Sequence, residues 1–212
     1  MTVFFICLIS LSLFGPCLVL FYPAVFSLKV RKQLRGTFEV IPSFGYPMLV
    51  RNKYRARLSR WAGRFISRPS LEVKVSGLPL LVLSQYLASL NDNLGFKPTG
   101  KCIVNGKVTY VWTDNPALQV WITSGEQYDL LSKILRAESS SYIPILRIGV
   151  TNNTFGSVGL CPWVKLSNLS LQVIESPRQL ASYFDALMAF IDRLTVWQKN
   201  QTHAKNTFIQ NS

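Results

Sequence analysis

An unbroken apolar stretch at the N-terminus constrains this chain more than any other feature. The run from Val3 to Leu28 contains no charged side chain, and it ends at Lys29. A helix of this length rises about 1.5 Å per residue and is longer than the roughly 30 Å hydrocarbon core of a bilayer. Residues 1–28 are therefore predicted to form a single transmembrane helix.

Positive charge is concentrated directly after this stretch. The chain of 212 residues has a net charge of +13. Residues 29–68 hold eleven Lys and Arg against one acid, Glu39, a net charge of +10, whereas residues 69–212 hold a net +3. Because cytoplasmic loops carry the excess of Lys and Arg, the pattern predicts a single-pass membrane protein with its N-terminus outside and its folded part in the cytoplasm.

A cleaved secretory signal is the alternative reading of the same stretch. Residues 24–27 end in a small side chain that a signal peptidase would tolerate, although no basic region precedes the apolar run. The chain would then be a secreted or lumenal glycoprotein, since three glycosylation sequons begin at Asn152, Asn168 and Asn200.

The basic residues 29–68 are predicted to form a juxtamembrane segment with an amphipathic helix. Over residues 51–68, four large apolar residues recur at steps of four, three and four, which gathers them on one helical face. Such a stripe among Arg residues is typical of a helix at an anionic lipid surface, although it could instead pack on the protein's own domain. The predicted contacts to the membrane or another anionic surface are Lys29, Arg31, Lys32, Arg35, Tyr54, Arg57, Arg60, Trp61, Arg64 and Phe65.

Residues 69–199 alternate strand and helix signals and are predicted to form one α+β domain. The pair Asn105-Gly106 predicts a tight hairpin in which Ile103 faces Val108. A long helix is expected from Pro177 onward, and a disordered tail over residues 200–212. Further helices are expected at 80–90 and 124–137, and further strands at 37–41, 47–50, 71–75, 118–123, 142–151, 164–166 and 170–174.

Together these signals predict a fold class of α+β. A single transmembrane helix is followed by a mixed or antiparallel sheet, with about three helices packed mostly on one face. The predicted organisation is a membrane helix, a basic segment, an α+β domain and a tail, over residues 1–28, 29–68, 69–199 and 200–212.

Residues for catalysis and metal binding are scarce. The single histidine, His203, lies in the polar tail, so neither a rigid catalytic triad nor a zinc site with several histidines can be assembled. The ten acidic residues are scattered, and no nucleotide-binding, hydrolase or metalloprotease motif occurs. We therefore predict no enzymatic activity, no cofactor and no metal. Neither the motifs nor the overall pattern resembles a known family.

The function that these features favour is that of a non-enzymatic accessory, assembly or scaffold subunit of a larger membrane protein complex. Its folded domain would bind a protein partner at the cytoplasmic face, beside an anionic lipid surface. A nucleic-acid-binding protein that uses the basic segment is possible but not favoured, because the charge is not spread over a folded reading surface.

Overall fold

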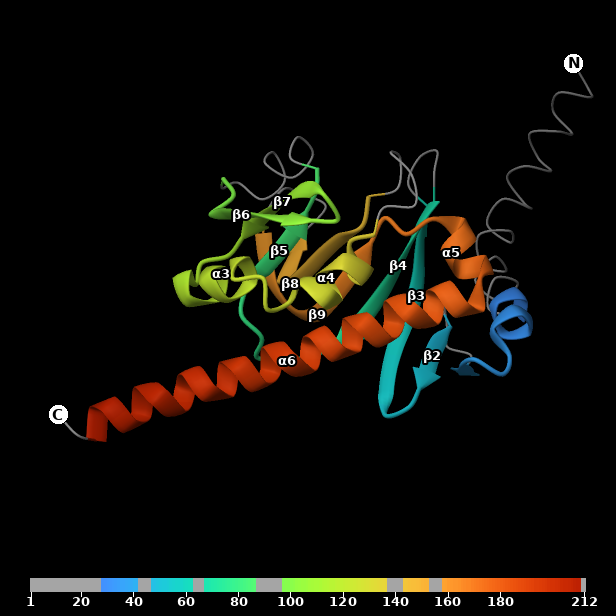
Figure 1. Cartoon of the computed structure of the whole chain (residues 1–212). Helices are drawn as coiled ribbons and strands as arrows, with labels where there is room; N and C mark the ends of the chain where they lie inside the picture. Colours follow the sequence, from blue (N-terminus) through green and yellow to red (C-terminus); the bar gives the residue numbers. More distant parts are fainter. Residues whose placement is uncertain are drawn as a thin grey trace, which may run out of the picture. The chain divides into compact units, whose positions relative to one another are not determined.

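The computed structural model describes residues 28–41, 47–62, 67–86, 97–136, 143–152 and 158–210 (Figure 1). The chain divides into two compact units, one ending at Ser59 and the other beginning at Arg60. The boundary falls within strand β3, Tyr54–Ala62. Each unit has its own strands and its own basic surface.

The smaller unit combines a short helical segment, residues 28–34, with an antiparallel ribbon. Strand β1, Glu39–Ile41, pairs with β2, Met48–Arg51, and β2 pairs with the first part of β3. Asn52 turns the chain between β2 and β3 with a φ of 55°, a left-handed conformation that Asn tolerates. The predicted strands at 37–41 and 47–50 are thus confirmed.

The larger unit is built on an antiparallel sheet with the strand order β4-β9-β8-β5-β7-β6. The strand pairs of this unit are antiparallel among the described residues, and β8 carries a register shift between Ile148 and Val150. Among the described residues β6 pairs with β7 alone, so β6 forms an edge of the sheet. The strands are β4 Ser67–Lys74, β5 Leu81–Ser84, β6 Gly100–Val104, β7 Lys107–Trp112, β8 Ile145–Asn152 and β9 Val158–Ser167.

One face of this sheet is apolar and fully buried. Strand register aligns a row of five side chains across five strands, and none of them has exposed surface. The row consists of Leu71, Leu166, Leu146, Leu83 and Val111. Gly100 of β6 stands opposite Val111, and a Cβ at Gly100 would come within 3.0 Å of the Gln119 side chain. The helix that carries Gln119 therefore packs against this face, which we call the covered face.

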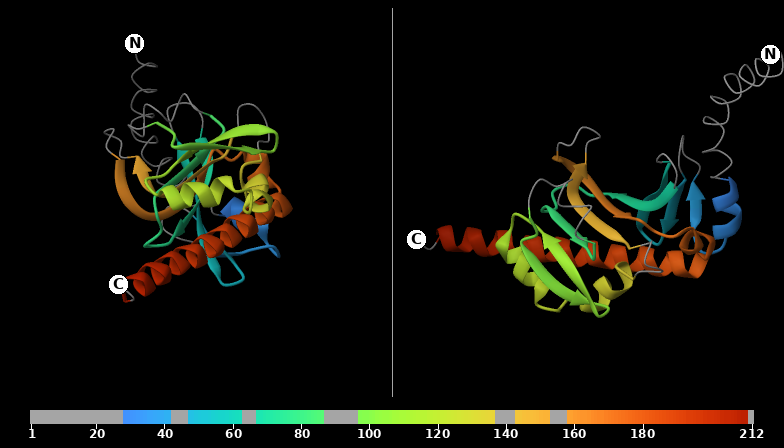
Figure 2. Two further views of the ribbon diagram at one scale, coloured as in Figure 1. Left: turned by 60° about the vertical axis from the view of Figure 1, so that its left-hand side comes forward. Right: turned by 90° about the horizontal axis from the view of Figure 1, so that it is seen from above.

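Four helices accompany the sheet in the described part of the larger unit. Figure 1 shows α4 and α6 passing in front of strands, and Figure 2 shows the same elements from two other sides. Their bounds are α3 Pro116–Thr123, α4 Tyr128–Ile134, α5 Leu171–Glu175 and α6 Pro177–Gln210. The ring of Trp121 in α3 stacks on Trp197 of α6, with centroids 5.7 Å apart. The buried positions of α6 follow the helical period, from Leu180 through Phe184 and Leu187 to Leu194, which confirms the long helix predicted from Pro177.

The predicted amphipathic helix at 51–68 is wrong. The described residues of this range form the end of β2, all of β3 and the start of β4. Backbone pairing with β2 supplies the hydrogen bonds that a helix would have made internally, as in the register of Arg57 with Met48. Because successive residues of a strand alternate between faces, helical spacing does not gather the apolar residues on one side.

Four other segments also differ from expectation. Residues 81–84 of the predicted helix at 80–90 form β5, whereas residues 87–90 lie outside the described ranges. The predicted strand at 118–123 is helix α3, because Asn115 caps it by accepting a hydrogen bond from the Leu118 amide at 3.1 Å. The predicted strand at 170–174 is helix α5, and its N-cap residue Ser170 accepts a hydrogen bond from the Val173 amide at 3.3 Å. The tail predicted to be disordered is helical as far as Gln210.

The predicted transmembrane fold is contradicted as well. Residues 1–27 of the predicted span lie outside the described residues, and none of the helices described elsewhere is both long enough and apolar enough to cross a bilayer. Helix α6 has the length, but charged residues such as Asp185, Asp192 and Arg193 interrupt its apolar character. The fold class is corrected to antiparallel sheet with four accompanying helices among the described residues, and the prediction of a single-pass protein with a cytoplasmic domain loses its support.

Candidate functional site

The β6–β7 hairpin presents apolar side chains at the edge of the larger unit's sheet. Asn105 and Gly106 form its turn with φ angles of 54° and 70°, the left-handed values that a two-residue type I′ turn requires. Ile103 lies opposite Val108, as predicted, and these side chains are 59% and 42% exposed. A neighbouring apolar pair on an edge hairpin is a surface that another chain can cover.

This pair belongs to the face of the sheet opposite the covered face, which we call the outer face. Next to it, the Nζ atom of Lys101 lies 5.5 Å from the centroid of the Tyr110 ring. The Tyr110 and Trp112 rings follow, with centroids 6.1 Å apart. Trp112 packs in a buried cluster with Val82 and Ile145, on which Tyr110 also rests. The exposed pair therefore adjoins packed side chains, which lose little conformational entropy when a partner binds.

A polar row crosses the same outer face farther along the sheet. Strand register places Glu72, Lys165 and Arg147 side by side on β4, β9 and β8. The Nζ atom of Lys165 lies 2.8 Å from Oε1 of Glu72. Burial lowers the pKa of Arg147, and within the described structure its buried Nε atom has no hydrogen-bond partner. The row thus contains one acid and two cations, so it has an excess of positive charge.

A basic pocket of about 430 Å³ lies at the turn end of the hairpin. Lys107 of β7 and Lys133 and Arg136 at the end of α4 contribute its charges, and none of its lining residues is acidic. The amide Nδ2 of Asn105 donates to the Ser132 carbonyl at 2.7 Å and ties the turn to α4. The end of the hairpin is therefore both positively charged and held in place.

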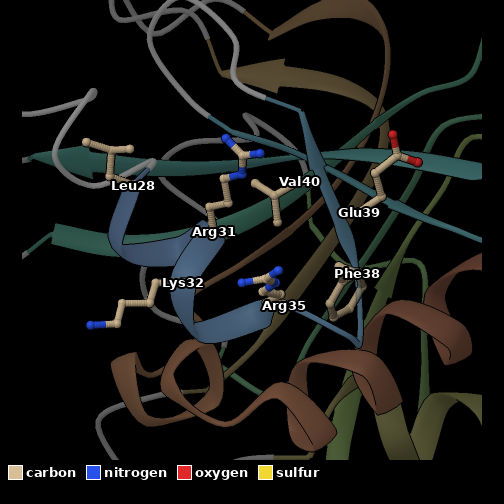
Figure 3. Close-up of a pocket in the computed structure, with 7 residues that line it drawn as sticks. All are labelled: Leu28, Arg31, Lys32, Arg35, Phe38, Glu39 and Val40. Carbon is tan, nitrogen blue, oxygen red and sulfur yellow. The ribbon is translucent and has the colours of Figure 1, made fainter.

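A second basic pocket lies within the smaller unit and has a volume of about 510 Å³ (Figure 3). Its cations are Arg31, Lys32 and Arg35, which come from the helical residues 28–34 and the turn that follows. Its other lining residues are Leu28, Phe38, Glu39 and Val40. The pocket combines three positive charges with an apolar wall, an arrangement suited to an anion that has an apolar part.

The residues predicted to contact an anionic surface are only partly brought together. Arg31, Lys32 and Arg35 line this one pocket, whereas Lys29 is an exposed neighbour on the same helical segment and is not part of the lining. Four others, Tyr54, Arg57, Arg60 and Trp61, belong to strand β3. The last two, Arg64 and Phe65, lie outside the described residues.

Sequence reasoning found the hairpin but not its exposure. An apolar alternation predicts a buried face equally well, whereas in the structure Ile103 and Val108 are exposed on the hairpin that ends the sheet. Lys101 and Lys107 were the available signal, because edge strands often carry lysine. The turn pocket had no such signal, since its cations come from segments that are distant in sequence.

The described residues contain no group of three or more His, Cys, Asp and Glu side chains that could hold a metal ion. Cys102 of β6 is a half-buried thiol, and burial raises its pKa.

The fold and surface define an α+β protein with a helix-backed antiparallel sheet, an exposed edge hairpin and two basic pockets. Neither protein-family models, nor curated proteins, nor solved structures give a match to this chain.

Proposed function

We propose that this chain is a non-enzymatic accessory subunit that binds an acidic protein partner through the β6–β7 hairpin. The observation that carries the proposal is the exposed pair of Ile103 and Val108 on the hairpin that ends the sheet. Full burial of an aliphatic side chain of this size contributes about 1.5–3 kcal/mol, so the pair can serve as the apolar centre of an interface.

The charge around the hairpin supports an acidic partner. Lys101 flanks the apolar pair, and Lys107, Lys133 and Arg136 surround the turn without an acidic residue in the pocket lining. A second copy of this chain would bring another net charge of +13 to the contact. Because like charges oppose association, a partner with Asp and Glu around an apolar centre fits this surface better than a self-contact.

Site-specific photocrosslinking tests this proposal in cells. A photoreactive phenylalanine analogue is placed at Ile103 of the full chain, and a matched probe is placed at Val120, which is 66% exposed on α3. We expect one abundant crosslinked protein with the probe at 103 and not with the probe at 120. Equal crosslinking to the same proteins from both positions would contradict the proposal.

Binding of the purified crosslinked protein then measures the role of the hairpin. Ile103→Glu is expected to weaken binding by about tenfold or more, since it replaces apolar burial with a charge that repels an acidic partner. Val120→Glu makes the same chemical change outside the hairpin, and its affinity should stay within about twofold of the unchanged chain. Equal losses in the two variants would exclude the hairpin as the contact.

A further inference from the structure

The pocket of the smaller unit holds three cations that lack anionic partners in the described structure. Arg31, Lys32 and Arg35 line it, and no hydrogen bond or ion pair to their head groups occurs within the described ranges. The one acid in the lining is Glu39, whose carboxylate points away from the guanidinium groups of Arg31 and Arg35 in Figure 3. Gathering like charges costs free energy, which a bound anion would recover.

The wall beneath these cations is fixed by several contacts. The Phe38 amide donates to the Leu34 carbonyl at 3.0 Å, which joins the start of the ribbon to the helical segment. Arg51 donates from Nη1 to the Thr37 carbonyl at 3.2 Å, and its guanidinium carbon lies 5.8 Å from the centroid of the Phe38 ring. Phe38 is therefore held in place before any ligand arrives, and less entropy is lost on binding.

We propose that this pocket binds a small molecule with at least two phosphate groups and an apolar or aromatic portion. Guanidinium groups bind phosphate oxygens in bidentate fashion, and three cations match the charge of a diphosphate or triphosphate. A volume of about 510 Å³ lies within the range of small-molecule sites. Leu28, Phe38 and Val40 form the apolar wall for the remainder of the ligand.

A compact ligand fits these observations better than a nucleic acid. Proteins that bind single strands have a positive groove that follows several nucleotides, together with aromatic side chains on which bases stack. Here the three cations come from a span of five residues and line one pocket. This proposal does not depend on the hairpin or on its protein partner.

Titration calorimetry of the full chain tests the pocket with defined probes. At moderate salt we expect ATP and pyrophosphate to bind and adenosine to give no heat, because the phosphates provide the recognised charge. Arg31→Gln and Arg35→Gln should each weaken ATP binding by about tenfold or more, the loss expected for a charge-assisted contact. Binding of a single-stranded oligonucleotide without binding of ATP or pyrophosphate would overturn the proposal.

Two controls separate recognition from folding and from bulk charge. Lys29→Gln removes one positive charge from the same helical segment outside the pocket lining, so ATP affinity should stay within about twofold. Arg35→Lys keeps the charge but loses the bidentate guanidinium, so its affinity should fall between those of the unchanged chain and Arg35→Gln. Unchanged thermal unfolding confirms that each variant folds, and equal ATP affinity in all of them would refute the assignment.

Discussion

Arg193 shows how single charged side chains join elements of the larger unit. From α6, its Nη1 and Nη2 atoms donate to the two carboxylate oxygens of Asp129 at 3.0 and 3.2 Å, and Nη1 also donates to Oε1 of Gln127 at 3.3 Å. The two charged side chains are about half exposed, so solvent screens the pair. The bidentate geometry therefore orients α4 on α6 more than it stabilises the fold.

The first prediction concerns the pH dependence of this ion pair. The hydrogen bond from Arg193 lowers the pKa of Asp129 in the folded protein. The pair therefore stabilises the fold at pH values above the pKa of an unfolded Asp, near 4. This stabilisation is lost as the pH falls through the lower pKa that Asp129 has in the folded protein. After Arg193→Gln, NMR titration should show a higher pKa for the Asp129 carboxyl. The free energy of unfolding at pH 7 should fall by no more than about 1 kcal/mol.

Asp114 provides the matched comparison. Asp129→Asn should reproduce most of the stability loss at pH 7 and should remove the difference between neutral and acidic pH that the pair produces. Asp114→Asn makes the same change at an exposed acid, and it should leave the free energy of unfolding within about 0.5 kcal/mol. A pKa of Asp129 that does not respond to the loss of Arg193 would contradict the assigned cause.

The second prediction concerns Arg147, whose charge is mostly buried beside another cation. Lys165 lies directly opposite it on β9, and like charges across a strand pair destabilise a sheet. Arg147→Met keeps an apolar stem and removes the charge, so the free energy of unfolding should stay the same or rise by about 1–2 kcal/mol. Urea unfolding measures this free energy. Lys165→Met is the control, and it should lower the free energy of unfolding because it removes the ion pair that Lys165 makes with Glu72 at 2.8 Å.

At the scale of elements, local sequence signals predicted a helix or strand correctly where the tertiary contacts favour the same conformation. Asn105-Gly106 can adopt the turn that a two-residue hairpin needs, and the apolar period after Pro177 continues for many turns, so both elements could be predicted. Residues 51–68 have a helical apolar spacing, but antiparallel partners provide their backbone hydrogen bonds. No single-sequence pattern reports such a partner, which is why β3 was predicted as a helix.

The candidate sites follow the same division. A run of cations close in sequence, such as Arg31, Lys32 and Arg35, could be predicted to contact an anion, because short spacing keeps them together in any local structure. The turn pocket combines Lys107 with Lys133 and Arg136 from another element, so its prediction needed the fold. Exposure of Ile103 likewise depends on which strand ends the sheet.

The third prediction tests the cap that makes residues 116–123 a helix. The Oδ1 atom of Asn115 accepts a hydrogen bond from the Leu118 amide, so Asn115→Ala should lower the free energy of unfolding by about 1 kcal/mol. Ser124→Ala at the other end of α3 removes only a hydroxyl that donates to the Trp121 carbonyl at 2.9 Å, and it should cost a few tenths of a kcal/mol. Thermal or urea unfolding of both variants checks the order, and a reversal would show that the cap does not hold the helix.

At the scale of the whole molecule, a net charge of +13 determines how the chain interacts electrostatically with other molecules. The basic groups are present in each unit, as the pocket of the smaller unit and the turn pocket of the larger unit show. Such a charge attracts acidic surfaces over roughly a Debye length, about 10 Å at 0.1 M salt and 3 Å at 1 M. For the proposed complex we therefore expect charge to govern encounter, and the apolar pair on the hairpin to govern how long the complex lasts.

The fourth prediction separates these two contributions kinetically, with the protein identified by crosslinking at position 103. Raising the salt from 0.05 to 0.5 M should lower the association rate constant by about tenfold or more, while the dissociation rate constant changes by less than about threefold. Lys101→Gln should mainly slow association, because it removes an exposed charge beside the contact. Ile103→Ala should mainly speed dissociation, because it removes apolar burial at the centre. Two results would contradict this division between electrostatic steering and apolar docking: salt that acts chiefly on the dissociation rate constant, or two substitutions that change the same rate constant. Charge would then be part of the bound contact itself.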